Sequence, residues 1–150
     1  RLDRYRLRWR NVVYESGELK VVAYGQDGKS AASETVRTAG RPHHLVVTPD
    51  RTRLEGEGDL AFITVDVVDE KGTLCPFAGN RISFKVSGAG RYKAACNGDP
   101  TDFDALSSPD MKAFNGRLVA VVEAVAVAGE IRFEAESEGL GKASVELTNR

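Results

Sequence analysis

Apolar and polar residues alternate with a period of two along nearly the whole of this 150-residue sequence. In the segment LAFITVDVVD, for example, Ile63, Val65 and Val67 alternate with Thr64 and Asp66. Successive side chains of a β-strand point to opposite faces, so this spacing is typical of strands that bury one face. The sequence therefore predicts an all-β fold.

Turn-forming residues divide the alternating sequence into short segments. Gly25-Gln26-Asp27-Gly28 is typical of a hairpin connection between two of them. The run 118–125 could also be a helix, because leucine and alanine favour one, but its four valines and the glycine soon after it favour a strand. The predicted strands are residues 5–10, 19–24, 32–37, 45–48, 60–69, 81–87, 91–95, 118–125, 130–136 and 143–148.

Gly40-Arg41-Pro42 interrupts the pattern and marks a domain boundary, because proline cannot donate to a strand ladder and restricts the residue before it. Residues 41–150 then hold about seven short strands with turns between them, which is typical of an immunoglobulin-like antiparallel β-sandwich. Residues 1–40 are too short for a second sandwich. We expect them to be a three-stranded fragment of a second sandwich, truncated at the start of the chain.

The missing neighbours of such a fragment would leave unpaired backbone groups at its edge. We therefore expect residues 5–37 to dock as a three-stranded sheet on the second domain, or to pair between chains. The apolar face of the first of these strands includes Trp9, and we expect both Trp9 and Tyr24 to face a core.

The charges of the chain argue against several kinds of partner. Its 21 basic and 22 acidic residues are scattered and give a formal charge of −1, so nothing indicates nucleic acid or an anionic membrane. No apolar run approaches the roughly 18 residues of a membrane span, and no membrane insertion is expected. The chain begins at Arg1, and we expect it to be a piece of a longer protein.

No combination of residues in the sequence indicates catalysis. The two histidines, His43 and His44, are adjacent, so on a strand they would point to opposite faces and could not act together. The two cysteines, Cys75 and Cys96, lack partners at zinc-ligand spacing. We expect two free thiols, with a single disulfide as the alternative, and no cofactor.

The segment 96–116, CNGDPTDFDALSSPDMKAFNG, has no strand pattern although strands flank it. A loop of this length in a compact domain is commonly functional or disordered. Its aspartates Asp99, Asp102 and Asp104 are weak candidates for calcium ligands, because calcium prefers oxygen ligands on loops. Their spacing lacks the EF-hand pattern, however, and turn caps are the favoured interpretation.

Large apolar residues in the same loop argue against disorder. Phe103, Leu106, Met111 and Phe114 predict that the loop packs against another surface. The residues that we assign to an interdomain-packing loop are Asn97, Gly98, Asp99, Pro100, Phe103, Phe114, Asn115 and Gly116.

Two parts of the sequence resemble glycoside hydrolase family 2. Residues 9–42 look like the end of the immunoglobulin-like domain that follows the catalytic barrel in bacterial β-galactosidases of that family. This resemblance implies that residues 1–40 are the C-terminal part of a truncated immunoglobulin-like domain. Residues 59–90, 97–124 and 130–147 resemble the next, C-terminal domain, which is also similar to domains of invasin and intimin. The motifs Asn97-Gly98-Asp99-Pro100 and Lys112-Ala113-Phe114-Asn115-Gly116 carry most of the resemblance.

The resemblance implies a parent enzyme that hydrolyses terminal β-galactosides through two glutamates on a barrel. Those glutamates belong to a domain that this chain lacks, so no catalytic residue is carried over to it. The implied partners are the other domains of the parent enzyme and further copies in a homo-oligomer. The implied location is periplasmic or extracellular.

Three functions follow as hypotheses. The first is a non-catalytic accessory region that braces the barrel domain or helps an oligomer to assemble. The second is a carbohydrate-binding module, which would stack sugars on exposed aromatic residues. The third, an adhesive spacer, rests on analogy of fold alone. The aromatic candidates for the second are Trp9, Tyr14, Tyr24, Tyr92 and Phe103.

Overall fold

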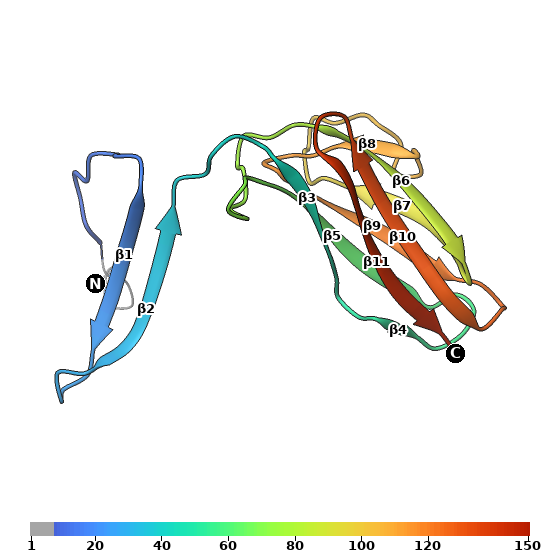
Figure 1. Cartoon of the computed structure of the whole chain (residues 1–150), viewed down its shortest axis with the longest axis horizontal. Coiled ribbons are helices and arrows are strands. Elements are labelled where there is room, and N and C mark those ends of the chain that lie inside the picture. The colour runs from blue at the N-terminus through green and yellow to red at the C-terminus, as the bar shows by residue number, and fades with distance from the viewer. Residues whose placement is uncertain (1–7) are drawn as a thin grey trace. The chain divides into compact units, whose positions relative to one another are not determined.

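The computed structural model describes residues 8–150 and divides into two compact units, 1–38 and 39–150. The first unit contains two antiparallel strands, β1 (Glu18–Tyr24) and β2 (Ser30–Arg37), which form a hairpin (Figure 1). The hairpin turn is closed by hydrogen bonds from Gly25 N to Lys29 O at 2.8 Å and from Gly28 N to Gly25 O at 3.0 Å. Both strands are largely exposed to solvent.

The predicted first strand, residues 5–10, is not observed where it can be tested. Residues 5–7 lie outside the described residues, and residues 8–10 form no strand. Trp9 and Tyr24 are 63% and 68% exposed, so the expectation that they face a core was wrong for this chain. Alternation identifies the apolar face of a segment but does not supply the second layer that would cover it.

The second unit is an antiparallel β-sandwich, as predicted, with no helix among residues 8–150 (Figure 1). One sheet has the order β4-β11-β10-β6-β8 and the other the order β3-β5-β9-β7. All neighbouring strands are antiparallel except β4 and β11. The strands are β3 (His44–Pro49), β4 (Arg53–Leu54), β5 (Leu60–Val68), β6 (Arg81–Gly88), β7 (Gly90–Cys96), β8 (Asp110–Lys112), β9 (Arg117–Ala124), β10 (Gly129–Ser137) and β11 (Gly141–Asn149).

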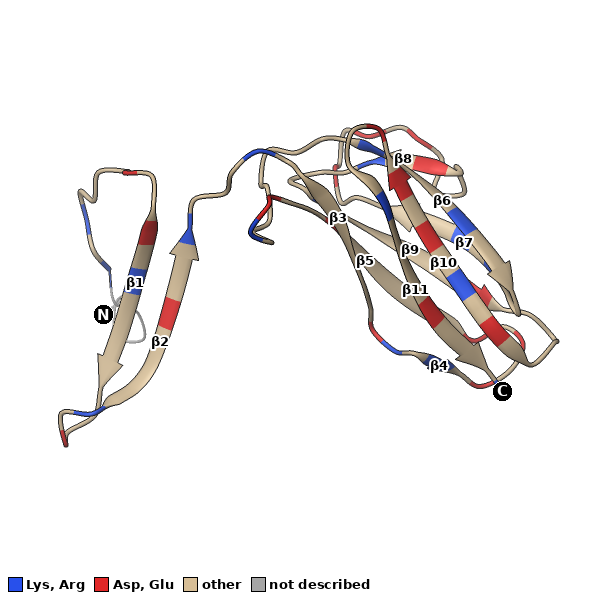
Figure 2. Ribbon diagram, in the orientation of Figure 1, with Lys and Arg blue, Asp and Glu red and all other residues tan. Residues whose placement is uncertain are grey.

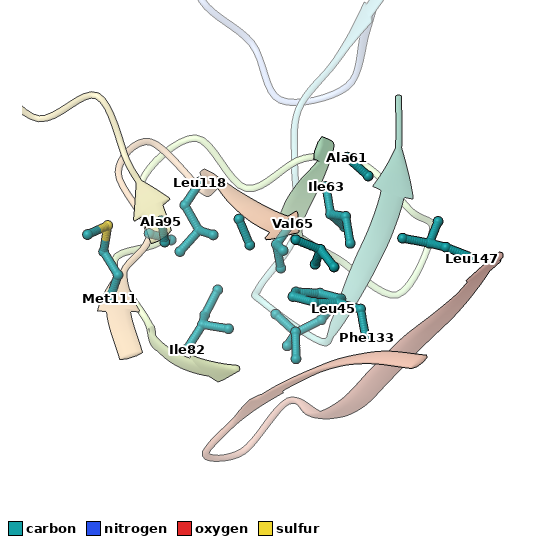
Figure 3. Close-up of a cluster of buried hydrophobic side chains, with 14 of the residues drawn as sticks. Leu45, Ala61, Ile63, Val65, Ile82, Ala95, Met111, Leu118, Phe133 and Leu147 are labelled. Atoms are coloured by element: carbon teal, nitrogen blue, oxygen red, sulfur yellow. The ribbon is translucent and has the colours of Figure 1, made fainter. Parts of the chain in front are cut away.

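Alternate residues of both sheets point inward and form one core (Figure 3). Phe133 on β10 is completely buried, and its ring stacks against Phe84 on β6 at a centroid distance of 6.1 Å. Phe84 in turn stacks at 5.5 Å against Tyr92 on β7, in the opposite sheet. Burying one such side chain is worth about 1.5–3 kcal/mol. The largest fully buried side chains are Phe133, Leu54, Ile63, Ile82, Met111, Leu118, Ile131, Leu147, Val65, Val67 and Val122.

Two strands of the sandwich were not predicted. β4 has two residues and β8 has three, which is too short for a period-two pattern to show. β8 lies inside the segment 96–116 and pairs with the start of β6, where Arg81 is opposite Lys112. The segment that lacked a strand pattern is therefore two loops with a short strand between them.

The start of the second unit is held by one carboxylate. Asp69, in the turn after β5, accepts hydrogen bonds from Gly40 N at 2.7 Å, Thr73 N at 2.8 Å and Lys71 N at 2.9 Å. These bonds, led by the one from Gly40, lower the pKa of the Asp69 carboxyl. The side chain is only 5% exposed, and burying a carboxylate is tolerated because its oxygens are so well satisfied.

Candidate functional site

Three loops gather at one end of the sandwich, and we call them together the loop end: residues 74–80, 97–109 and 113–116. The first leads from β5 to β6, the second from β7 to β8, and the third from β8 to β9. Gly116 N donates to Ala78 O at 2.9 Å, and Ala113 N donates to Asn80 O at 2.9 Å. Asn97 Nδ2 donates to Lys112 O at 3.0 Å. The first and third loops are thus joined to each other, and the second is joined to β8, which leads into the third.

The aspartates of the loop cap turns, as the sequence predicted. Asp99 Oδ1 accepts hydrogen bonds from Thr101 N at 2.8 Å and from Thr101 Oγ1 at 2.7 Å. Asp102 Oδ1 accepts one from Asp104 N at 2.9 Å, while Asp102 Oδ2 accepts one from Asn97 Nδ2. The Asp104 N–H, and after it the Asn97 amide, lower the pKa of the Asp102 carboxyl.

The third candidate calcium ligand, Asp104, is held by an arginine. Arg81 donates to Asp104 Oδ2 from both terminal nitrogens, at 2.9 and 2.8 Å, and to Asp110 Oδ1 at 3.0 Å. No group of three or more His, Cys, Asp or Glu side chains that could hold a metal ion occurs within residues 8–150. Asp99 and Asp102 therefore cap turns, whereas Asp104 is paired with Arg81.

Tyr92 anchors the loop from the core side. Its hydroxyl donates to Ser108 O at 2.7 Å, and Ala95 N on the same strand donates to Leu106 O at 2.7 Å. Burial, and after it the negative charge of Asp110, raises the pKa of Tyr92 to about 12. Tyr92 was a candidate for a sugar-stacking platform, but its ring stacks against Phe84 between the sheets. The ring of Tyr92 therefore packs in the core, and its hydroxyl group binds the loop.

The apolar residues of the loop end divide into two groups. Met111 is 2% exposed and belongs to the core, so the prediction that the segment packs holds for this side chain. Phe103 and Leu106 are 96% and 59% exposed, and Phe114 is 38% exposed. Among the described residues Phe103 is therefore almost uncovered, and its docking on another domain remains a prediction.

Phe77 was missed by the sequence analysis, although it is 99% exposed. It lies in the loop 74–80, beside Ala78, whose carbonyl accepts the hydrogen bond from Gly116 N. An aromatic residue directly after Pro76 in a loop could have indicated a contact surface, because loops exposed to solvent are usually polar.

The Asn115-Gly116 motif forms the tight turn between β8 and β9. Both residues have positive φ, 52° and 78°, and Phe114 and Arg117 exchange backbone hydrogen bonds at 3.0 and 3.1 Å across them. This is the geometry of a type I′ hairpin turn, which favours Asn-Gly. A Cβ on Gly116 would lie 2.2 Å from the Cys75 carbonyl oxygen, so glycine is required there for space as well as for φ.

The remaining candidates for chemistry are the two histidines and the two cysteines. His43 Nδ1 lies 3.2 Å from His44 Nδ1, so the expectation that these rings point apart was wrong; His43 precedes β3, where strand alternation does not yet apply. Cys75 and Cys96 are both free, as favoured; Cys75 is buried and Cys96 is exposed.

The fold and the loop end thus define an immunoglobulin-like β-sandwich. Residues 45–146 match the family model described as glycoside hydrolase family 2 C-terminal domain 5, and residues 1–32 match a domain of unknown function, DUF4982. The chain therefore belongs to glycoside hydrolase family 2, which confirms the resemblance seen in the sequence.

Relatives and solved structures agree with this assignment. The chain is 38% identical to Beta-galactosidase BoGH2A of Bacteroides ovatus over 98% of its own length and 17% of that protein's. It is 31% identical to a beta-glucuronidase of Formosa agariphila, over 95% of its own length and 15% of that protein's. The chain thus spans about one sixth of the length of these relatives.

Among solved structures, a glycosyl hydrolase family 2 member from Bacteroides cellulosilyticus superposes with a TM-score of 0.86 at 28% identity, over 93% of this chain and 18% of that one. A beta-glycosidase from Bacteroides vulgatus superposes with a TM-score of 0.86 at 25% identity, over 91% of this chain and 18% of that one. The D00-D0 domain of intimin is 15% identical, with a TM-score of 0.54 over 91% of this chain and 66% of that one, and shows the fold alone.

Proposed function

We propose that this chain is a non-catalytic accessory region of a family 2 glycosidase, and that its loop end packs against another domain of that enzyme. The observation that carries the proposal is Phe103, which is 96% exposed although hydrogen bonds and an ion pair hold its loop in place. An ordered loop that presents an apolar ring to solvent is typical of a docking surface.

The parent enzyme that we propose hydrolyses terminal β-galactosides or related β-glycosides. Support comes from the family and from relatives described as a beta-galactosidase and a beta-glucuronidase. Retaining glycosidases need two carboxyl groups about 5 Å apart on either side of the scissile bond. In the described residues the loop-end carboxylates are instead occupied by turns and by Arg81.

Secretion to the periplasm or the cell exterior is part of the same proposal and rests on the resemblance of the sequence to glycoside hydrolase family 2. The described residues contain no helix long and apolar enough to cross a membrane.

The decisive experiment compares the intact enzyme with this chain alone. In the intact enzyme, the double substitution Phe77→Ala and Phe103→Ala should lower the melting temperature and expose the loop end to proteases. In the 150-residue chain the same pair should have little effect, because both rings are almost fully exposed there. Val127→Ala, an exposed apolar residue in the turn from β9 to β10 at the other end of the sandwich, is the matched control.

Equal melting temperatures and equal proteolysis of the intact enzyme with and without the two phenylalanines would contradict docking through the loop end. A chromogenic β-galactoside should not be hydrolysed by the 150-residue chain. Turnover that is abolished by changing a residue of this chain would contradict the non-catalytic role.

Carbohydrate binding is a second candidate, and one observation favours it. Trp9, Tyr14 and Tyr24 of the first unit are 63%, 74% and 68% exposed, so these rings are accessible in this chain. Sugar rings stack on exposed aromatic faces, which are apolar and rigid. Affinity electrophoresis of the chain in gels that contain β-galactans tests this candidate: retardation that is lost in Trp9→Ala would favour sugar binding over bracing.

A further inference from the structure

The outer faces of the two sheets differ in character. On the sheet that contains β6, β10 and β11, charged residues follow one another along the outward positions, as the coloured bands in Figure 2 show. Phe133 and Ala135 point into the core, while their neighbours on the strand carry charge. The outward residues of this face include Lys85, Glu130, Arg132, Glu134, Glu136, Lys142 and Glu146. We expect this charged face to remain exposed to solvent.

The outer face of the other sheet has an apolar centre. We call its outward residues on β5, β9 and β7 the strip: Phe62, Thr64, Val119, Val121, Ala94 and Cys96. Phe62 is 45% exposed, whereas its neighbour Ile63 is completely buried, which shows that Phe62 points outward. In the register of the sheet, Phe62 lies opposite Val121, and Val121 lies opposite Ala94.

A row of charged residues lies at each end of the strip, and these residues form ion pairs with one another on the same face. Arg117 on β9 donates to Asp66 on β5 through two nitrogens, at 2.6 and 2.9 Å. At the other end of the strip, Glu123 accepts from Arg91 Nε at 2.6 Å and from Lys93 Nζ at 2.9 Å. Because each of these charged side chains already has a partner of opposite charge, covering this face leaves few charges to desolvate unpaired.

We propose that the strip is an interface between two copies of this chain. A two-fold axis in the interface, nearly parallel to β5 and β9 and midway between them, exchanges the two strands and keeps the rows in register. Each Phe62 then lies on Val121 of the second copy, and each Asp66 lies opposite Arg117 of the second copy. Aligned packing of two sheets within about 30° is a common arrangement, with the sheets about 10 Å apart.

The partner is a second copy because the charged row at one end of the strip is complementary to itself. The row that holds Asp66 and Arg117 carries one acid and one base at mirrored positions, so the rotation brings opposite charges together. The strip contains fewer residues than the roughly 20–30 on each side of a standard interface, so the dimer is weak and depends on concentration. This proposal is independent of the docking that we assign to the loop end.

The test is sedimentation of the full 150-residue chain under reducing conditions, which prevent a disulfide through Cys96. From about 10 μM to about 1 mM the chain should shift from monomer towards dimer. Phe62→Lys should abolish the shift. Ser144→Lys, the same type of change on the charged face, and Leu19→Lys, on the separate hairpin, should leave it in place.

Charge exchange tests the two-fold geometry more sharply. Asp66→Arg and Arg117→Asp should each remain monomeric, because like charges then face each other across the axis. An equal mixture of the two variants should form a heterodimer, in which opposite charges meet again although the pair within each chain is broken.

Three results would overturn the proposal: a wild-type chain that stays monomeric up to about 1 mM, a dimer that survives Phe62→Lys, or a mixture of charge variants that does not associate. If the chain stays monomeric but Cys96 is protected from alkylation in the intact enzyme, the strip is covered by another domain, and the second copy is excluded as the partner.

Discussion

The guanidinium of Arg81 donates two hydrogen bonds to one oxygen of the Asp104 carboxylate, at 2.9 and 2.8 Å. This ion pair joins the first residue of β6 to the middle of the loop 97–109. It holds in place the segment that presents Phe103 to solvent, and so links the sandwich framework to the proposed docking surface.

Arg81→Gln should therefore release the loop 97–109 while leaving the sandwich folded. The side chains of Arg81 and Asp104 are 46% and 35% exposed, and such pairs contribute at most about 1 kcal/mol to stability. Chymotrypsin should cleave the variant after Phe103 faster than the wild type, as mass spectrometry of the fragments would show. Arg132→Gln, which removes an ion pair on the outer face of β10, is the control. Equal cleavage rates in all three proteins would contradict the role of Arg81.

Gly116→Ala and Gly98→Ala should differ strongly although both glycines have φ of 78°. For Gly98 no atom lies within 4 Å of the added Cβ, so only backbone strain of about 1–2 kcal/mol is expected. For Gly116 the Cβ would lie 2.2 Å from Cys75 O, and we expect a loss of about 3 kcal/mol or more. Urea denaturation measures both values, and equal losses would contradict the close approach of the two loops.

Asp69→Asn should destabilise the sandwich at neutral pH and weaken its sensitivity to acid. The pKa of the Asp69 carboxyl is lower in the folded chain, chiefly through the Gly40 and Thr73 amides, so the unfolded chain binds the proton more readily. Its contribution is complete above the unfolded pKa of about 4 and is lost as pH falls through the lower, folded value.

Thermal unfolding of wild type and Asp69→Asn at pH 7 and pH 3 checks this linkage. The melting temperature should fall less between pH 7 and pH 3 in the variant than in the wild type. Glu146→Gln, a change at an exposed position of β11, should keep the difference of the wild type. If Asp69→Asn keeps it as well, the carboxylate of Asp69 is not the source of acid sensitivity.

The two thiols should differ in their reactivity. Cys96 is exposed, whereas Cys75 is buried, and burial together with the nearby Asp69 carboxylate raises the pKa of the Cys75 thiol. In dilute solution, where the chain is monomeric, iodoacetamide at pH 8 should therefore add one group quickly, at Cys96, and a second only after unfolding. Peptide mapping identifies the site, and Cys96→Ser should show no fast reaction. Rapid modification of both thiols in the folded chain would contradict the burial of Cys75.

The sequence predicted the sandwich well because burial of one strand face fixes the period of its apolar residues. β5, β6 and β10 show this directly, since Ile63, Ile82 and Phe133 point inward as expected. The same period fails for residues 8–10, because alternation cannot tell whether a second layer covers the apolar face. It also misses β4, which pairs in parallel with the distant β11.

The loop end was predicted only in part, since contacts of loops depend on neighbours that are remote in sequence. The capping aspartates could be recognised because their hydrogen bonds are local, as between Asp102 and Asp104 N. The ion pair between Arg81 and Asp104 joins residues that are 23 positions apart, so no local sequence pattern indicates it. The Asn115-Gly116 pair did carry one, that of a type I′ turn, which the sequence analysis did not use.

The pairing of β4 with β11 sets an order of events for the growing chain. Thr148 lies opposite Arg53, and the buried Asn149 accepts from Gly56 N and donates to Val125 O and Val127 O. The sandwich therefore cannot close until its last strand has left the ribosome, since contacts of such long separation form late. Until then Leu54, which is buried in the finished fold, remains available to chaperones.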